Sequence, residues 1–359
     1  MSTTTVSSAM ISSGVIPTVD PARNFIIDGN FTQWPEGNIT GIANDGYGPA
    51  LFANLHSGGE VAHDVKQAVS NGYNFMHVDI TTAETAVGAG DYLFQEYRIT
   101  GSDFLHIHEQ TVTIQFTHNH TKTGTYCVGL RNSANNRGYT FEYTQSVSNT
   151  EEVHTETVTL DQSGTWLLTE ADVGLRLMFV VMTGSTFQAS ADTWTAGNYW
   201  ATSNQVAGAD SASNNFKIGK VGLYLGSTAP SSFIAEPVAT VKDQVSYYVQ
   251  RWNYDQATSE HGMVGAGHAY STSRILFGKE FDKELRVAPS MTSSGTGTFE
   301  AYYGAAKTDF GALSLDHIGK HGCRISVSAA SGTPFTVGHA VNMRRDATDV
   351  CFIMADARH

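Results

Sequence analysis

Hydrophobic and polar residues alternate, or form short apolar runs, along most of residues 24–233. Segments of about seven residues with this pattern are separated by clusters of Gly, Asn, Asp and Ser, which favour turns. The predicted strands are NFIIDGNF, NFMHVDI, TVTIQFTH, TGTYCVGLR, RGYTFEYTQ, HTETVTL, LRLMFVVM and NFKIGKVGLYL. So many short strands at this spacing predict a two-sheet β-sandwich, with a jelly roll as the expected form.

The pattern changes after GSTAPSSFIAEP, a segment rich in Pro and Ser. In the next segment apolar residues recur at helical spacing, which predicts one amphipathic helix entered through Pro237. These residues are Val238, Val241, Val245, Tyr248, Val249 and Trp252. Strand patterns then return in SRILFGKEF, RVAPSMTS, TFEAYYG, CRISVSAA, FTVGHAVNM and DVCFIMADA. The sequence therefore predicts an all-β protein, with an N-terminal jelly-roll β-sandwich (24–233) and a smaller C-terminal β domain with one amphipathic helix (234–359).

Residues 1–23 form a separate segment that is rich in Ser and Thr and has no amphipathic period. Such a segment has no core-forming pattern of its own. We interpret residues 1–23 as an anchor tail, in which residues 1–22 dock onto a neighbouring protein. The alternative is a tail that lies on its own domain.

Composition and charge narrow the function classes. Charged residues make up 15% of the chain and the formal net charge is −13. An acidic chain lacks the Lys and Arg that neutralise phosphates, so no nucleic-acid partner is expected. No apolar stretch is long enough for membrane insertion, and no signal peptide is recognised. Three scattered cysteines favour buried thiols in a protein assembled in a reducing cytoplasm, although Cys323 and Cys351 could approach one another across strands.

The histidines offer the most conspicuous candidate for a metal site. His106 and His108 in FLHIHEQ, and His118 and His120 in FTHNH, would each share a strand face. If the two strands paired, four imidazoles could converge on a metal. The alternative is outward polar positions or a subunit-interface cluster, and we expect no cofactor.

Catalytic motifs are absent from the sequence. There is no G-x-S-x-G elbow, phosphate-binding glycine motif or H-E-x-x-H. Glu151, Glu152, Glu170 and Asp172 are candidates for paired glycosidase carboxylates, and Asp28 and Asp79 for calcium ligands. The alternatives are ordinary surface carboxylates and turn or strand-edge hydrogen bonds. We therefore expect no enzymatic activity.

The segment ASADTWTAGNYWATSNQ has the composition of a glycan-binding surface. Aromatic rings stack on the CH faces of sugars, and amides and carboxylates bind their hydroxyl groups. Our candidate glycan-binding residues are Asp192, Trp194, Asn198, Tyr199 and Trp200. The alternative is that one or both tryptophans belong to the core.

Two separated stretches resemble bacteriophage virion fibre and spike proteins. NFIIDGNFTQW followed by YGPALF is similar to the start of their carbohydrate-binding-module-like jelly roll, although Phe52 replaces a frequent Trp and an Asp-Arg pair is missing. DQVSYYVQRWNYD and LRVAPSM resemble a later helix and strand, with Gln250, Arg251, Trp252, Arg286 and Pro289 at matching positions. TWTAGNYW and NFKIGKVGLYLG resemble the closing strands of the jelly roll.

The resemblance implies a non-enzymatic virion structural protein, a tail fibre or head fibre, that contacts host-surface polysaccharide during attachment. It also implies a homo-oligomer, most simply a homotrimer, that joins other virion proteins. The alternatives are a capsid or tail decoration protein with an architectural role, a polysaccharide-degrading tailspike enzyme, and a cell-encoded carbohydrate-binding module.

Overall fold

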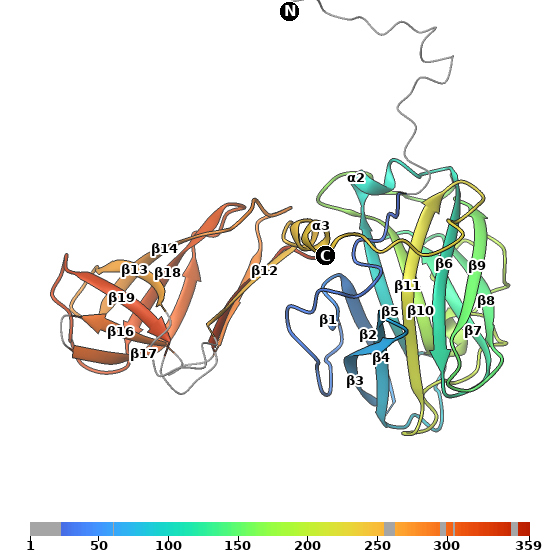
Figure 1. Cartoon of the computed structure of the whole chain (residues 1–359), viewed down its shortest axis with the longest axis horizontal. Coiled ribbons are helices and arrows are strands. Elements are labelled where there is room, and N and C mark those ends of the chain that lie inside the picture. Colours follow the sequence, from blue (N-terminus) through green and yellow to red (C-terminus); the bar gives the residue numbers. More distant parts are fainter. Residues whose placement is uncertain (1–22, 60, 255–262, 295–298, 304–305, 346–350) are drawn as a thin grey trace, which may run out of the picture. The chain divides into compact units, whose positions relative to one another are not determined.

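A computed structural model describes residues 23–59, 61–254, 263–294, 299–303, 306–345 and 351–359. The chain divides into two compact units, Met1–Val238 and Ala239–His359. The predicted anchor tail, residues 1–22, lies outside the described residues. Both units are built almost entirely from strands, which confirms the predicted all-β fold (Figure 1).

The first unit is a sandwich of two antiparallel sheets that face each other (Figure 1). The six-stranded sheet has the order β1 (Gly46–Tyr47), β2 (Phe52–Ser57), β5 (Tyr92–Thr100), β10 (Val173–Thr183), β7 (Gly124–Arg131) and β8 (Gly138–Gln145). The five-stranded sheet has the order β3 (Ala62–Ser70), β4 (Tyr73–Thr82), β11 (Asn215–Leu225), β6 (Thr111–His120) and β9 (Glu152–Thr159). Two short helices, α2 (Gly101–Phe104) and η1 (Ser185–Phe187), lie in connections.

Aromatic side chains from both sheets meet in the core of the sandwich. Phe179 of β10 packs against Phe116 of β6 with ring centroids 5.1 Å apart, and against Phe52 of β2 at 6.5 Å. All three rings are almost fully buried. Burying a side chain of this size contributes roughly 1.5–3 kcal/mol. The alternation that predicted β6 and β10 places these residues between the sheets.

The predicted first strand, NFIIDGNF, is instead a series of turns. Asp28 and Phe31 adopt left-handed backbone angles, with φ of 58° and 50°. The Asp28 carboxylate accepts hydrogen bonds from the Thr32 backbone and hydroxyl and from the Gln33 backbone. Burial raises the pKa of Asp28 to about 6. This side chain organises the turn, because Asp readily bonds nearby backbone groups.

The second unit contains a three-stranded sheet and a closed barrel. The sheet has the order β12 (Val249–Tyr254), β20 (Cys351–Asp356) and β15 (Ser290–Ser293). The barrel consists of β13 (Met263–Ala269), β14 (Arg274–Glu280), β18 (Gly322–Ala329), β17 (Ala306–Asp316), β16 (Phe299–Tyr303) and β19 (Ala340–Arg345). Its core includes Ile275, Phe277, Phe310 and Val327.

The predicted helix is shorter than its apolar pattern. The helix α3 spans Val238–Val245, and Val241 and Val245 are its buried residues. Val249 and Trp252 belong to β12, where they pair with Asp356 and Ile353 of β20. Pairing with β20 therefore makes residues 249–254 a strand, although their apolar spacing is helical.

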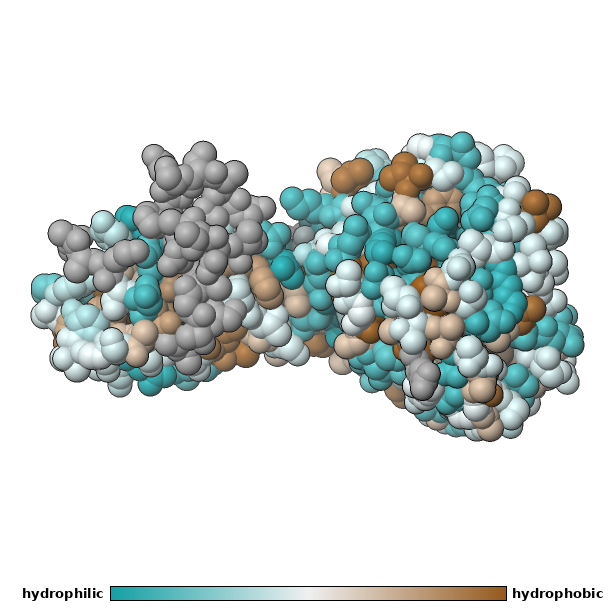
Figure 2. All heavy atoms as spheres, turned by 90° about the horizontal axis from the view of Figure 1, so that it is seen from below, coloured by the Kyte–Doolittle hydropathy of each residue, from teal (hydrophilic) through white to brown (hydrophobic). Residues whose placement is uncertain are grey.

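Three further findings concern membrane-spanning helices, the cysteines and the surface. Within the described residues, neither α-helix has the length and apolar character needed to cross a membrane. Cys127, Cys323 and Cys351 are all buried, and no disulfide joins them. On the face shown in Figure 2, apolar residues of the sandwich form separate small spots among polar ones.

Candidate functional site

The connection between β10 and β11 lies on the outer face of the six-stranded sheet; we call residues 184–204 the covering segment. Trp200 and Ala201 pack against Phe94 of β5, Cys127 of β7, and Met178 and Val180 of β10. Since Phe179 points into the sandwich, Met178 and Val180 point to the outer face. An isolated bridge between Gly138 and Thr195 fixes the segment at the β8 edge.

Trp200 is buried beneath the covering segment, with 2% of its surface exposed. One ring face stacks on Phe187, with centroids 4.1 Å apart and planes 17° apart. The indole N–H donates to the Thr183 hydroxyl at 2.7 Å. The prediction that Trp200 belongs to the glycan-binding residues is wrong, because this ring has no free face. The alternative, a core tryptophan, is the observed arrangement.

Trp194 lies at the edge of the sandwich, between β8 and β9, and is half-buried. Its indole N–H donates to the Thr159 carbonyl at 2.9 Å. The ring packs on Tyr139 at 5.3 Å and stands nearly perpendicular to Trp166, with centroids 5.8 Å apart. Trp166 is also half-buried, and it rests on Phe104 and His108. We call Trp194 and Trp166 the tryptophan pair.

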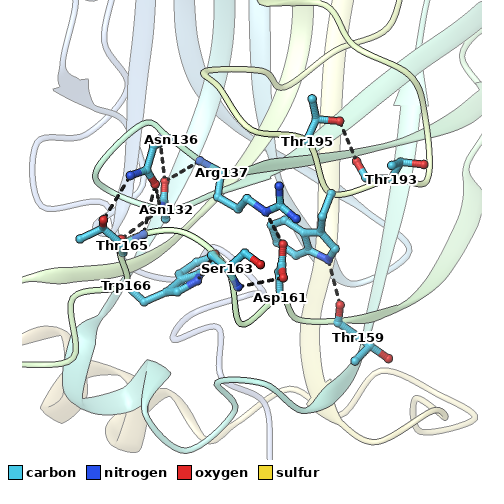
Figure 3. Close-up of polar contacts among 11 residues, drawn as sticks. Asn132, Asn136, Arg137, Thr159, Asp161, Ser163, Thr165, Trp166, Thr193 and Thr195 are labelled. Atoms are coloured by element: carbon cyan, nitrogen blue, oxygen red, sulfur yellow. Dashed lines mark hydrogen bonds and ion pairs between the residues drawn. The ribbon is translucent and has the colours of Figure 1, made fainter.

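Polar side chains surround the tryptophan pair (Figure 3). Arg137 forms an ion pair with Asp161, and Asp161 also accepts the Ser163 backbone N–H at 2.9 Å. Burial acts to raise the pKa of Asp161, but these two donors hold it below its usual value. The Trp166 indole donates to the Ser163 carbonyl at 2.8 Å.

A second group of polar contacts fixes the neighbouring turn. Asn136 donates to the Thr165 hydroxyl and accepts the Thr165 backbone N–H, both at 3.2 Å. Asn132 binds the Thr165 carbonyl at 3.0 Å (Figure 3). Hydrogen bonds at Ser163 and at Thr165 therefore fix the loop that carries Trp166.

The remaining candidate residues have different surroundings. Asp192 is exposed with φ of 57°, and its backbone N–H donates to the Thr140 carbonyl at 2.8 Å. Asn198 is half-buried and accepts a hydrogen bond from Arg131. Tyr199 is half-buried, and its carbonyl oxygen occupies the space that a Cβ at Gly138 would need. The structure places Asp192 and Trp194 at the accessible surface, whereas Asn198 holds a buried arginine.

The covering segment and β8 line an open polar pocket of about 630 Å³, which we call the Glu142 pocket. It is lined by Glu142, Ser185, Gln188, Ala189, Ser190, Ala191, Thr202, Ser203 and Asn204. Glu142 Oε1 accepts hydrogen bonds from the Thr202 hydroxyl and from Asn204 Nδ2, the latter at 3.0 Å. Among the described residues, none donates to Glu142 Oε2. This oxygen and the Gln188 and Asn204 amides can bind the hydroxyl groups of a ligand.

The predicted histidine site does not form. FLHIHEQ is not a strand, because residues 101–109 form α2 and the turns that follow it. His118 and His120 do share a face of β6, but it is the core face, and both are buried. His118 bonds Gln145 and His120 bonds Tyr143, each at 2.9 Å. Within the described part of the chain, no group of three His, Cys, Asp or Glu side chains could hold a metal.

The other carboxylates named from the sequence serve local structure. Glu151 accepts from Ser70 and Asn71, Glu152 caps the turn at Ser146 and Val147, Glu170 accepts from Ser102, and Asp172 accepts from Thr169. The two possible calcium ligands have different partners. Asp28 accepts hydrogen bonds from the backbone of Thr32 and Gln33, and Asp79 forms an ion pair with Lys66.

Comparisons with known proteins give weak structural similarities. No protein-family model and no curated protein matches the chain. A solved structure described as "CBM4 structure and function" matches with 14% identity and a TM-score of 0.32, covering 56% of this chain and 100% of that chain. A family 11 carbohydrate-binding module from Clostridium thermocellum, in complex with a mixed-linked tetrasaccharide, matches with 13% identity and a TM-score of 0.30, covering 54% and 98%.

The enzymatically active domain of tailspike protein 4 from bacteriophage CBA120 matches with 10% identity and a TM-score of 0.27, covering 52% of this chain and 22% of that chain. At these TM-scores the similarities support no inference about what this chain binds.

Proposed function

We propose that this chain is a non-enzymatic structural protein of a bacteriophage particle, a fibre or spike, that binds host-surface glycan. The observation that carries the glycan-binding part of the proposal is the Glu142 pocket, whose lining residues Ala189–Ala191 precede Trp194 in the covering segment. The pocket supplies hydrogen-bonding groups, and the tryptophan pair supplies partly exposed rings.

The chemistry of the site suits a polyhydroxylated ligand. Sugar hydroxyls both donate and accept, so they match a carboxylate beside side-chain amides. Glu142 Oε2 is a carboxylate acceptor, and charge-assisted hydrogen bonds are roughly twice as strong as neutral ones. The half-buried rings of Trp194 and Trp166 lie at the β8–β9 edge, outside the pocket lining, and provide apolar area there. Residues Ala189–Ala191 line the pocket and lead directly to Asp192 and Trp194.

A binding role fits the pocket better than hydrolysis. Glycoside hydrolysis uses a pair of carboxylates on either side of the scissile bond. Glu142 is the single carboxylate among the residues that line the pocket. This feature opposes the alternative of a polysaccharide-degrading tailspike.

The particle context of the proposal rests on the sequence resemblance. Residues 1–22 would join other virion proteins, residues 24–233 would contact glycan, and residues 234–359 would form the second domain of a homotrimer. A tail fibre, a head fibre and a purely architectural decoration protein differ in where the chain lies on the particle. Light scattering of the purified chain tests the trimer, and a monomer would contradict it.

The experiment that tests glycan binding compares two carboxylate substitutions. The purified full chain is titrated with host-surface polysaccharide by calorimetry, as wild type, as Glu142→Gln and as Glu109→Gln. Glu142→Gln should weaken binding about tenfold, since one charge-assisted hydrogen bond contributes roughly 1.5–3 kcal/mol. Glu109 is exposed and lies outside the pocket, so Glu109→Gln should bind as wild type. Absence of binding, or equal affinities for the three proteins, would reject the pocket as a glycan site.

A further inference from the structure

Three arginines lie side by side on adjacent strands of the six-stranded sheet. Arg176 of β10 is directly opposite Arg98 of β5 on one side and Arg131 of β7 on the other. All three project to the outer face, as Met178 and Val180 do. Like charges directly opposite one another destabilise a sheet. We call these residues the arginine row.

The carboxylates around the arginine row are fewer than the guanidinium groups. Glu96, whose side chain is fully buried, accepts from Arg98 Nε at 2.6 Å and from Arg176, and its Oε2 lies 3.8 Å from Arg131. Asp45 forms an ion pair with Arg98. Among the described residues, the ion pairs of the arginine row involve these two carboxylates, and the Tyr47 hydroxyl accepts from Arg98 at 3.2 Å.

The bonding capacity of Arg131 and Arg176 is not used up. Arg131 donates to Asn198 and its guanidinium lies 5.1 Å from the centre of the Trp200 ring. Arg131 Nε and Arg176 Nε are buried, and neither has a hydrogen-bond partner among the described residues. The Arg176 side chain is 18% exposed, more than Arg98 or Arg131, so it is the guanidinium that solvent reaches best.

The arginine row and the Glu142 pocket share one face of one sheet. Arg131 is opposite Gly138 of β8, and Glu142 lies four residues further along the same strand. This separation is roughly 13 Å along the strand. Asn198, which binds Arg131, belongs to the covering segment that also forms the pocket wall.

We propose that the arginine row binds the carboxylate of an acidic sugar, so that the glycan recognised on this face carries uronic-acid-type residues. The inference rests on the proposed glycan-binding function and specifies the chemical class of its ligand. A carboxylate would add negative charge beside Arg176, the most exposed guanidinium of the row, and Arg is the side chain that best matches its planar geometry.

The test uses small probes, so that it does not depend on the Glu142 pocket. Glucuronate, glucose and sodium sulfate are titrated separately into the full chain and followed by ligand-observed NMR. Wild type should bind glucuronate at least tenfold more tightly than glucose or sulfate. Arg176→Gln should reduce glucuronate affinity about tenfold, and Arg324→Gln, which removes an arginine of the second unit, should leave it unchanged.

The outcomes separate the two proposals. Equal binding of glucuronate and glucose by wild type, or an unchanged affinity in a folded Arg176→Gln variant, overturns the arginine row as a carboxylate site. Equal binding of sulfate and glucuronate also overturns the sugar assignment. If Arg176→Gln does not fold, the wild-type comparison of the three probes still decides. Glycan binding that depends on Glu142 but shows no preference for glucuronate would leave the proposed function intact and reject this inference alone.

Discussion

The His120 imidazole lies flat against the Phe216 ring, with centroids 4.1 Å apart and planes 9° apart. His120 is one of several histidines within or beside the sandwich core, and burial lowers the pKa of its imidazole well below the usual value. His118 lies next to it, with its ring centroid at 5.4 Å, and burial lowers its pKa in the same direction. The sandwich therefore encloses imidazoles that must stay neutral.

The first prediction is that mild acid destabilises the sandwich. Burial lowers the pKa of both His63 and His154 to about 4, from 6.5 in the unfolded chain. As the pH falls through this window, the unfolded chain binds protons that the folded chain excludes, so unfolding becomes more favourable. For His63 alone, the loss reaches roughly 3 kcal/mol at pH 4. Urea unfolding measured from pH 7.5 to pH 4 checks this, and a flat profile below pH 6.5 would contradict it.

The second prediction separates the two tryptophans of the covering segment. Trp200→Ala should lower the free energy of unfolding of the sandwich by roughly 3–5 kcal/mol, because it leaves a cavity between Phe187 and Phe94. Trp194→Ala should cost about 1 kcal/mol and should weaken glycan binding. Chemical unfolding and calorimetry measure both effects. Similar losses of stability at the two positions would mean that Trp194 is also part of the core.

The third prediction concerns the close approach of the covering segment to the sheet. A Cβ at Gly129 would lie 2.5 Å from the Trp200 Cβ and 2.8 Å from its Cα. Gly129→Ala must therefore displace the segment, at a cost of roughly 1–3 kcal/mol. Glycan affinity should fall with the melting temperature.

Gly90→Ala is the matched control for this change, because no atom lies within 4 Å of the added Cβ. If Gly129→Ala keeps full affinity, the segment does not set the shape of the pocket.

The fourth prediction tests the proposed anchor tail. Deletion of residues 1–22 should leave the unfolding of the sandwich unchanged and prevent incorporation into particles. Calorimetry and immunoblotting of purified particles provide the two measurements. Normal incorporation of the shortened chain would reject an anchoring role for this segment.

The sequence predicts strands well where apolar residues alternate. β4, β6 to β11, β14 to β16 and β18 to β20 overlap the predicted segments. β2, β3 and β5 were missed because they carry polar residues that are paired within the folded chain. Gln95 and Glu96 of β5 are fully buried, and their partners include Asn54 and Arg98. A strand with a buried ion pair has no apolar period to recognise.

The sequence could identify one segment that contributes to the candidate site, but not the residue of another strand that completes it. ASADTWTAGNYWATSNQ does form part of the pocket wall, but Glu142 comes from β8 and has no local signal of its own. It meets Thr202 and Asn204 because β8 lies at the edge of the six-stranded sheet. The arginine row depends in the same way on strand register, which single-sequence patterns do not contain.

All but one of the residues that line the Glu142 pocket come from the stretch Ser185–Asn204. Ligand preference could therefore be transplanted between related chains by exchanging one contiguous stretch, while the paired strands beneath it are retained. If the chain has the proposed function, such exchanges would change the glycan that is bound, provided that Trp200, which packs the stretch onto the sheet, is retained.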